Sequence, residues 1–209
     1  MSGVRVRLAT VDDLAAIRRI GEVTWPVTYP FASAAYLAHA MDNWWSLAAL
    51  AESLARTRTF VAEASGPGPD REVVGVGAID LCGDRQDVRP GDWPSIWKFY
   101  LLPEYQGRGV GRLLLDRLLA QVPPAADGVM LEYIEGNERG AAFFRRHGFA
   151  EFRRDPPGRP DWPACVWMAR PAPRRPDAAG GSVAPRRLAD GWAGPRRLAG
   201  DGERPEGPR

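Results

Sequence analysis

Three glycines alternate along one short segment of the chain, at Gly107, Gly109 and Gly111. An apolar, aromatic run precedes them and a leucine-rich amphipathic run follows, which predicts a turn between a buried strand and a helix. In such a turn, successive backbone N–H groups can point into one concavity at the helix N-terminus, where the helix dipole also favours an anion. Because side chains would block a close approach to the backbone, these glycines are typical of a site that holds phosphate.

The residues around Gly111 exclude two common phosphate-binding motifs. A nucleoside-triphosphate loop requires a lysine and then a hydroxyl residue after its last glycine, and neither follows here. A dinucleotide fingerprint requires G-x-G-x-x-G, whereas this pattern closes one residue early, before Arg112. What remains is Gln106-x-x-Gly109-x-Gly111, which alone would also fit a purely structural turn.

This segment resembles the acyl-CoA pyrophosphate loop of the GCN5-related N-acetyltransferase (GNAT) superfamily, which reads Arg/Gln-x-x-Gly-x-Gly/Ala after a hydrophobic-x-Pro lead-in. A second block strengthens the resemblance, because many family members carry N-x-x-A-x-x-F-Y-x-x-x-G-F after the next strand. The residues here at those spacings are Asn137, Gly140, Phe143, Phe144, Gly148 and Phe149. The resemblance covers roughly Val4 to Arg170 and implies a GNAT domain over residues 1–170.

The resemblance implies an α/β (α+β) fold with a mixed, mostly antiparallel sheet of six to seven strands, helices on both faces, and a splay between strands 4 and 5. It also implies acetyl-CoA as co-substrate, with its pantetheine lying in the splay like an extra strand. The Leu101 N–H would polarise the thioester carbonyl. The residues implied to contact the cofactor are Tyr100, Leu101, Leu102, Gln106, Gly107, Arg108, Gly109, Val110, Gly111, Arg112, Asn137 and Phe144.

Acetyl transfer to an amine requires two proton movements. An alkyl ammonium, with a pKa near 10.4, must lose a proton before it attacks, and the departing thiolate, with a pKa of about 8.5, can then take one up. In many relatives a tyrosine supplies the second proton at the position of Phe144, so that role is lost here or moved to Tyr100 or Tyr133.

The base is expected on the fifth strand, at Glu132, although a solvent-facing strand residue would look the same. Several relatives use a glutamate at the position of Ser95, which cannot act as a base unaided. The other carboxylates near the expected cleft are Asp80 and Asp92, and removal of the proton through ordered waters is equally compatible with the sequence.

Six aromatic residues between Trp25 and Trp45 supply either an acceptor pocket, in which a cation lies against ring faces, or core between two helices. Trp25 and Tyr29 are the expected acceptor contacts. The function that the resemblance implies is N-acetyl transfer from acetyl-CoA to a primary amine of a small molecule or protein. The alternatives are a non-catalytic acyl-CoA sensor, which the loss of proton-transfer groups at Phe144 and Ser95 keeps open, and a scaffolding role of the C-terminal tail.

The tail differs in composition from the rest of the 209 residues. Residues 171–209 hold 7 Pro, 7 Gly, 8 Arg and 5 acidic residues, which predicts disorder. The remaining 20 basic and 21 acidic residues give residues 1–170 a net charge of −1, so we expect no nucleic-acid partner. Lys98 is the only lysine beside 27 arginines, a bias that we attribute to genomic base composition.

No run of 18 apolar residues and no secretory leader is evident, so the sequence predicts a cytoplasmic protein without a membrane partner, in which Cys82 and Cys165 stay reduced. Two histidines and two distant cysteines offer no metal-ligand spacing, and we predict no metal. His147 is expected to cap a helix before Gly148, and His39 to lie on the surface. A homodimer is compatible with the resemblance.

Strand and helix signals alternate through the body of the chain. Pro26 and Pro30 are expected to break the first helix, which starts at Asp12 or Asp13. The further helices are expected at Ala34–Arg56, Gly109–Gln121 and Asn137–Gly148. The expected strands are Val4–Leu8, Thr59–Ala64, Glu72–Leu81, Ser95–Leu102, Val129–Ile134, Ala150–Arg154 and Cys165–Ala169, with a polar loop at Gly83–Asp92.

Overall fold

The computed structural model describes residues 3–65, 71–81 and 93–172. The expected disordered tail was residues 171–209; its residues from 173 onward, the polar loop at 83–92 and Cys82 lie outside this range, so those predictions stay predictions. Pro171, the first residue of the expected tail, is instead the last residue of a strand. Within the described ranges, no helix is both long and apolar enough to cross a membrane.

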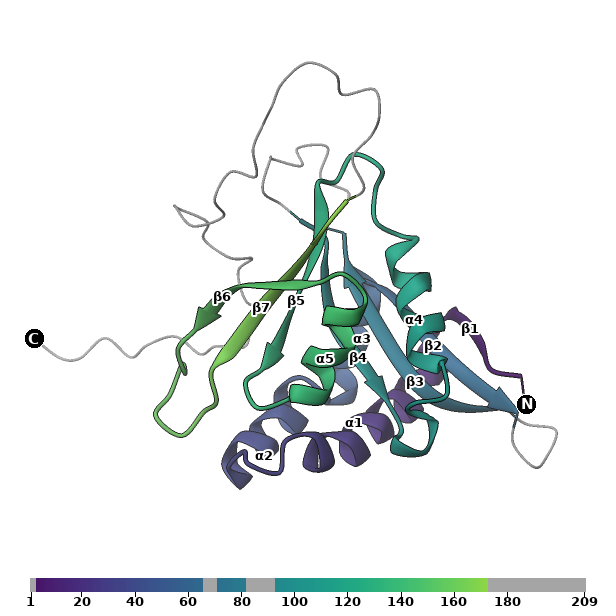
Figure 1. Cartoon of the computed structure of the whole chain (residues 1–209). Coiled ribbons are helices and arrows are strands. Elements are labelled where there is room, and N and C mark those ends of the chain that lie inside the picture. The colour runs from purple at the N-terminus through teal and green to yellow at the C-terminus, as the bar shows by residue number, and fades with distance from the viewer. Residues whose placement is uncertain (1–2, 66–70, 82–92, 173–209) are drawn as a thin grey trace, which may run out of the picture.

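A seven-stranded mixed sheet forms the centre of the molecule, in the order β1-β2-β3-β4-β5-β7-β6 (Figure 1). Every neighbouring pair is antiparallel except β4 and β5, which are parallel. The predicted mixed, mostly antiparallel sheet is therefore confirmed. The strands are β1 (Arg5–Leu8), β2 (Arg58–Ser65), β3 (Arg71–Asp80), β4 (Ser95–Leu101), β5 (Gly128–Ile134), β6 (Ala150–Asp155) and β7 (Cys165–Pro171).

Helices cover both faces of the sheet, as predicted (Figure 1). On one face Tyr100 of β4 packs against Trp25 and Trp45, and on the other Phe99 packs against Phe143 and Phe144. The helices are α1 (Leu14–Thr28), α2 (Ala34–Asn43), α3 (Leu47–Arg56), α4 (Val110–Leu119) and α5 (Glu138–Arg146), with single 3-10 turns η1 (Val11–Asp13) and η2 (Pro103–Tyr105).

The sheet opens between β4 and β5. These strands pair only where Ser95 faces Met130 and Ile96 faces Leu131, and beyond those two pairs they diverge. The predicted splay between strands 4 and 5 is thus confirmed, and it exposes the backbone of both strands along a gap.

A β-bulge in β4 lies where the gap begins. Ala78 of β3 faces Lys98, but the next residue, Ile79, faces Ile96, so Trp97 is an extra residue on β4. A bulge interrupts the strict alternation of side chains along a strand and re-aims its neighbours. Trp97 and Lys98, although adjacent in the chain, consequently both line the same cavity.

Two helix predictions were wrong. Helix α1 continues through Pro26 and ends at Tyr29, whose N–H donates to the Trp25 carbonyl at 2.9 Å. A proline beyond the first turn of a helix removes its own hydrogen bond and crowds the carbonyl four residues back, but only two helical residues follow Pro26. The single helix expected at Ala34–Arg56 is α2 and α3, because the Ser46 hydroxyl accepts a hydrogen bond from the Ala49 N–H at 3.2 Å and starts a new helix.

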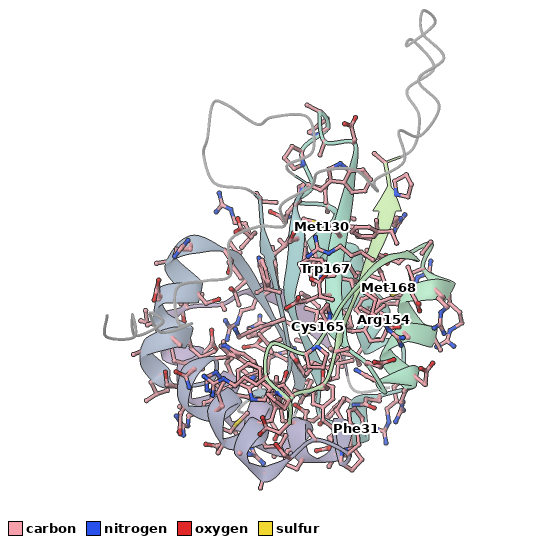
Figure 2. All side chains as sticks on the ribbon, turned by 90° about the vertical axis from the view of Figure 1, so that its left-hand side faces the viewer. Phe31, Met130, Arg154, Cys165, Trp167 and Met168 are labelled. Carbon is pink, nitrogen blue, oxygen red and sulfur yellow. The ribbon has the colours of Figure 1, made fainter. Side chains whose placement is uncertain are left out.

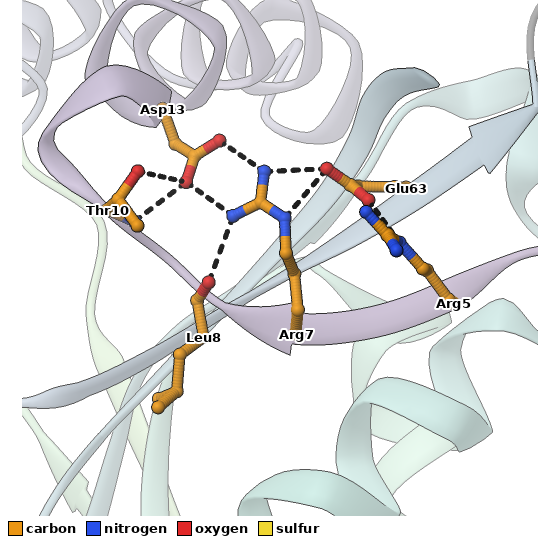
Figure 3. Close-up of polar contacts among 6 residues, drawn as sticks. All are labelled: Arg5, Arg7, Leu8, Thr10, Asp13 and Glu63. Atoms are coloured by element: carbon orange, nitrogen blue, oxygen red, sulfur yellow. Dashed lines mark hydrogen bonds and ion pairs between the residues drawn. The ribbon is translucent and has the colours of Figure 1, made fainter. Parts of the chain in front are cut away.

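An ionic network ties the edge strand β1 to β2 and to η1 (Figure 3). The Arg7 guanidinium lies between two buried carboxylates: Nε donates to Glu63 at 2.7 Å, and Nη1 donates to Asp13 at 2.7 Å. Arg5 donates to the second Glu63 oxygen at 2.6 Å, and Asp13 accepts from the Thr10 N–H at 2.7 Å. One arginine thus satisfies two carboxylates that burial would otherwise destabilise.

Gly21 of α1 allows the close approach of Trp45, which is 1% exposed. An added Cβ would lie 2.3 Å from Cδ2 of that indole ring. Gly→Ala inside a helix ordinarily stabilises by about 1 kcal/mol. Here we expect Gly21→Ala to lower the free energy of unfolding by about 2 kcal/mol in urea titrations, because a rigid buried ring must move. In a Trp45→Leu background the penalty should largely disappear, and an equal loss in both backgrounds would contradict this packing argument.

Candidate functional site

The turn between β4 and α4 has the backbone of an anion site. Gly107 and Gly109 have φ angles of 76° and 81°, a left-handed conformation that L side chains rarely adopt. No heavy atom lies within 4 Å of a Cβ built on either residue, so the space above both glycines is open. The sequence pattern therefore located a turn whose backbone a ligand can approach.

Amide groups at the start of α4 are available to such a ligand. The Leu113 N–H donates to the Gly109 carbonyl at 3.2 Å, so the amides of Val110, Gly111 and Arg112 precede the first bond of this helix. The Gln106 side chain donates to the Leu101 carbonyl at 2.9 Å and ties the turn to the end of β4.

The arginines of the turn lie at its rim. The side chains of Arg108 and Arg112 are exposed. The Arg108 guanidinium lies 6.0 Å from the Tyr105 ring centre, and the Arg112 Nε lies 3.6 Å from an Asp116 carboxylate oxygen. Both add positive charge beside the open amides.

Gly111 has a different role from the other two glycines. It is buried within α4, and a Cβ there would lie 3.3 Å from both the Leu101 and Phe143 side chains. The structure thus explains this glycine by the packing of α4 against β4 and α5, and not by the approach of a ligand that the sequence pattern indicated. Phe143, which the sequence analysis did not select as a site residue, lies beside the turn.

The hydrogen bonds along β4 show which of its backbone groups are already used within the protein and which face the gap, where the cofactor is expected. The Leu102 N–H donates to Val74 at 2.9 Å, and the Leu102 carbonyl accepts from Tyr105 at 3.0 Å, so both groups are engaged within the protein. Because backbone groups alternate along a strand, those of Tyr100 also face β3, and the Leu101 N–H faces the gap. The expected contact through Leu101 is thus favoured by this pattern, and those through the backbone of Tyr100 and Leu102 are not.

The second sequence block forms α5 beside the gap. Asn137 caps this helix through its side-chain oxygen, which accepts from the Gly140 N–H at 2.9 Å, and its side chain also hydrogen-bonds Tyr29. Phe144 is 7% exposed and packs against Phe99 and Phe149 in the core. The implied contacts of Asn137 and Phe144 with a cofactor stay predictions.

A cavity of about 340 Å³ lies on the face of the sheet that carries α1 to α3, and residues of β6, β7 and the segment between them also line it. Figure 2 looks onto this side of the molecule, where Cys165 and Trp167 of β7 lie near the middle of the view. The cavity brings together most of the residues predicted for catalysis and acceptor binding, namely Trp25, Tyr29, Asp80, Tyr100, Glu132 and Tyr133.

The aromatic residues of the first helical region serve as both core and cavity wall. Trp25 and Tyr29 are 4% and 3% exposed, and their ring centres lie 4.9 Å apart. Trp44, Trp45 and Tyr36 also line the cavity. Phe31 is half-exposed and packs over Gly136, and it lies at the lower edge of Figure 2, apart from Cys165.

The sequence did not indicate Trp162 as a residue of the cavity, and it predicted a different environment for His39. Trp162, from the segment between β6 and β7, lines the cavity and packs 5.1 Å from Tyr36. His39 was expected on the surface but is half-buried, with its ring 4.7 Å from Trp162. This correction arises because a segment over 100 residues away covers the helix that carries His39. No periodicity within α2 could indicate that contact.

Tyr29 and Tyr100 hold their protons firmly. Burial raises the pKa of Tyr100 well above its usual value, and a hydrogen bond to Tyr29 adds to the rise. Burial likewise raises the pKa of Tyr29, although hydrogen bonds with Tyr100 and Asn137 oppose the change. Both phenols are therefore protonated at neutral pH and can act only as proton donors there.

Tyr133, the alternative proton donor, uses its hydroxyl in a hydrogen bond within the protein. Its hydroxyl donates to Glu151 at 2.8 Å, and burial together with this bond raises its pKa to about 12. His147 ends α5 as predicted, with Nδ1 2.8 Å from the Phe143 carbonyl.

Two of the candidate bases lie at the cavity. Glu132 is exposed on β5, opposite Trp167 of β7, and Asp80 ends β3. Ser95, which replaces the glutamate of several relatives, is buried beside Asp80 in the sheet register. In the described ranges, no group of three or more His, Cys, Asp or Glu side chains is arranged to hold a metal.

Lys98 is the functional candidate that sequence reasoning missed. The side chain lines the cavity, with Nζ 5.6 Å from the centre of the Trp45 ring, and burial lowers its pKa to about 8. The available signal was a single lysine beside 27 arginines on an otherwise apolar strand, which had been attributed to base composition alone.

Comparisons with known proteins agree with this geometry. A family model described as an acetyltransferase (GNAT) domain matches residues 55–151. Uncharacterized N-acetyltransferases of Mycobacterium tuberculosis and Mycobacterium bovis are 31% identical over 144 residues, which is 68% of this chain and 84% of each relative.

Solved structures share the fold. The PaiA N-acetyltransferase from Thermoplasma acidophilum, in complex with coenzyme A, superposes with a TM-score of 0.61 at 16% identity, covering 81% of this chain and 99% of that one. The ribosomal-protein-S18-alanine N-acetyltransferase from Escherichia coli gives a TM-score of 0.59 at 18% identity, covering 86% and 100%.

Proposed function

We propose, from the premise that this chain belongs to the GNAT family of acetyltransferases, that it transfers an acetyl group from acetyl-CoA to a primary amine of a small molecule or protein. The observation that carries the proposal is the placement of three features on one strand. The open anion turn follows the end of β4, the gap opens along its edge, and the cavity lies at its bulge.

The residues at the gap fit acetyl-CoA. The pyrophosphate would be held by the amides of the first turn of α4, where the helix dipole adds to the attraction. Bound acetyl-CoA supplies a thioester whose carbonyl carbon an amine can attack. The Leu101 N–H, which faces the gap, would donate to the carbonyl oxygen as negative charge develops on it.

The side chains that we propose to move protons during the reaction line the cavity. Glu132 and Asp80 are the carboxylates there that we propose take the ammonium proton, directly or through water. Tyr100, kept protonated by burial, is the proposed donor toward the departing thiolate. Since a thiolate is a tolerable leaving group near neutral pH, this donor is expected to assist the reaction without being indispensable.

The test uses the full chain. Acetyl-CoA at 100 times its dissociation constant should stabilise the protein by about 2.7 kcal/mol, seen as a higher melting temperature. A panel of amines should then release CoA thiol at a rate that depends on the amine. Stabilisation without thiol release from any amine would favour the non-catalytic sensor, to which Phe144 and Ser95 point because neither offers the proton-transfer group found in relatives. No stabilisation would contradict both.

A further inference from the structure

Lys98 is a cation without a counter-charge. Within residues 3–65, 71–81 and 93–172 its ammonium makes no ion pair and no hydrogen bond, and its polar contact is the face of the Trp45 ring at 5.6 Å. Lys98 is half-buried, and a cation–π contact of about 1 kcal/mol offsets only part of what withdrawing an unpaired ammonium from water costs.

Other cations of the cavity wall are paired. Arg153 donates through Nε to Asp155 at 2.6 Å, and Arg56 lies 3.1 Å from Glu52. The carboxylates nearest these arginines are thereby neutralised. Lys98 is set apart by its lack of such a partner, and it lies on β4 at the start of the gap.

An unused hydrogen-bond donor lies at the same cavity. In the described part of the chain, the buried indole nitrogen of Trp97 lacks a hydrogen-bond partner, whereas the Trp25 side chain interacts with the Tyr100 hydroxyl. Both residues line the cavity, and Trp97 is the bulge residue next to Lys98. An indole N–H can only donate, so Trp97 and the neighbouring Lys98 together offer donors that suit the acceptor oxygens of a ligand.

We propose that the acceptor amine also carries a carboxylate, and that Lys98 is the residue that binds this group. The inference rests on the proposed acetyl transfer, because it names the class of amine that enters the same cavity. A carboxylate offers the charge that Lys98 lacks and several acceptor positions, while the aromatic wall packs against the apolar part of the acceptor. A second ammonium group of the acceptor at this position would instead bring like charge against Lys98.

The first test measures Lys98 directly. Because the chain has one lysine, protein grown with 13Cε-labelled lysine gives one side-chain signal in an NMR spectrum. The signal of the ligand-free protein should titrate near pH 8. Binding of an amino acid should raise that midpoint by about one unit or more, since a carboxylate beside the ammonium favours its charged form. The matched probe is the same amino acid with its carboxylate replaced by an amide.

The second test measures selectivity. In the wild type, kcat/KM for an amino acid should exceed that for its amide. Lys98→Met should reduce this ratio about 30-fold, mainly through a higher KM for the acid. Lys98→Arg should restore part of it. Arg56→Met removes a cavity cation that is already paired with Glu52, and it should leave the ratio unchanged.

The two proposals fail in different ways. If amino acids raise the titration midpoint of the Lys98 signal but no amine causes release of CoA thiol, the anion site is supported and the acetyl transfer is contradicted. If amines without a carboxylate are acetylated while no member of a panel of the protein amino acids moves the signal, the acetyl transfer stands and the anion site is wrong. An unchanged acid-to-amide ratio in Lys98→Met would also overturn the anion site.

Discussion

Replacing Gly109 by aspartate is expected to weaken acetyl-CoA binding about 100-fold, because a carboxylate placed at the open turn repels the pyrophosphate. Gly109 has a φ of 81° and no heavy atom lies within 4 Å of an added Cβ, so the Cβ of the new side chain enters open space. Calorimetric titration of the full chain with acetyl-CoA measures the effect.

Gly109→Asn is the matched control for this variant. Aspartate and asparagine have the same shape and tolerate left-handed backbone about equally, so the two variants share the backbone strain and differ only in charge. Asparagine should therefore weaken binding only several-fold. Because an N-cap aspartate favours its own helix, Gly109→Asp should be at least as stable as Gly109→Asn. Equal affinities of the two variants would contradict an anion at this turn.

Replacing Arg7 by methionine is expected to lower the free energy of unfolding by about 3 kcal/mol, because it leaves the buried Asp13 without its cation and removes one of the two arginines that pair with the buried Glu63 (Figure 3). Urea unfolding at neutral pH measures this. Arg19→Met is the control: its pair with Glu72 is exposed on both sides, so the loss should be below about 0.5 kcal/mol. A similar loss in both variants would show that the network contributes no more than a surface pair.

The same variant predicts a pH dependence. A hydrogen bond from Arg7 lowers the pKa of Asp13, and hydrogen bonds from Arg7 and Arg5 lower that of Glu63 although its burial opposes the change. Groups with a lowered pKa stabilise fully above their unfolded values of 3.8 and 4.5, and this stabilisation is lost as pH falls through the lower folded values. The difference in the free energy of unfolding between wild type and Arg7→Met should thus be constant near neutral pH and should decrease in acid.

Local signals in the sequence predicted the parts of the site that depend on local geometry. Gly107 and Gly109 are required by their own φ angles, and Asn137 caps α5, so neighbouring residues suffice to place them. The break between α2 and α3 was also readable from Ser46, but apolar residues continue at helical spacing across it and favoured one helix.

The acceptor cavity could not be predicted in this way. Trp162 reaches His39 only because the strands bring β6 and β7 beside α2. The bulge that places Lys98 with Trp97 arises from the pairing of β4 with β3, and no residue within β4 signals a skipped register. The lowered pKa of Lys98 results from its burial at the cavity, and that position follows from the pairing of β4 with β3.

The divergence of β4 from β5 gives the sheet four edges in place of two. The outer edges are β1 and β6, and the inner ones are the facing sides of β4 and β5 beyond their two paired positions. An open edge on the outside of a protein invites a strand of another chain and promotes aggregation. Here the inner edges lie within the molecule, where Phe143 and Phe144 of α5 pack against Phe99 of β4 on one face of the sheet and the cavity lies on the other. An extended ligand lying between β4 and β5 could pair with these backbone groups as an added strand would.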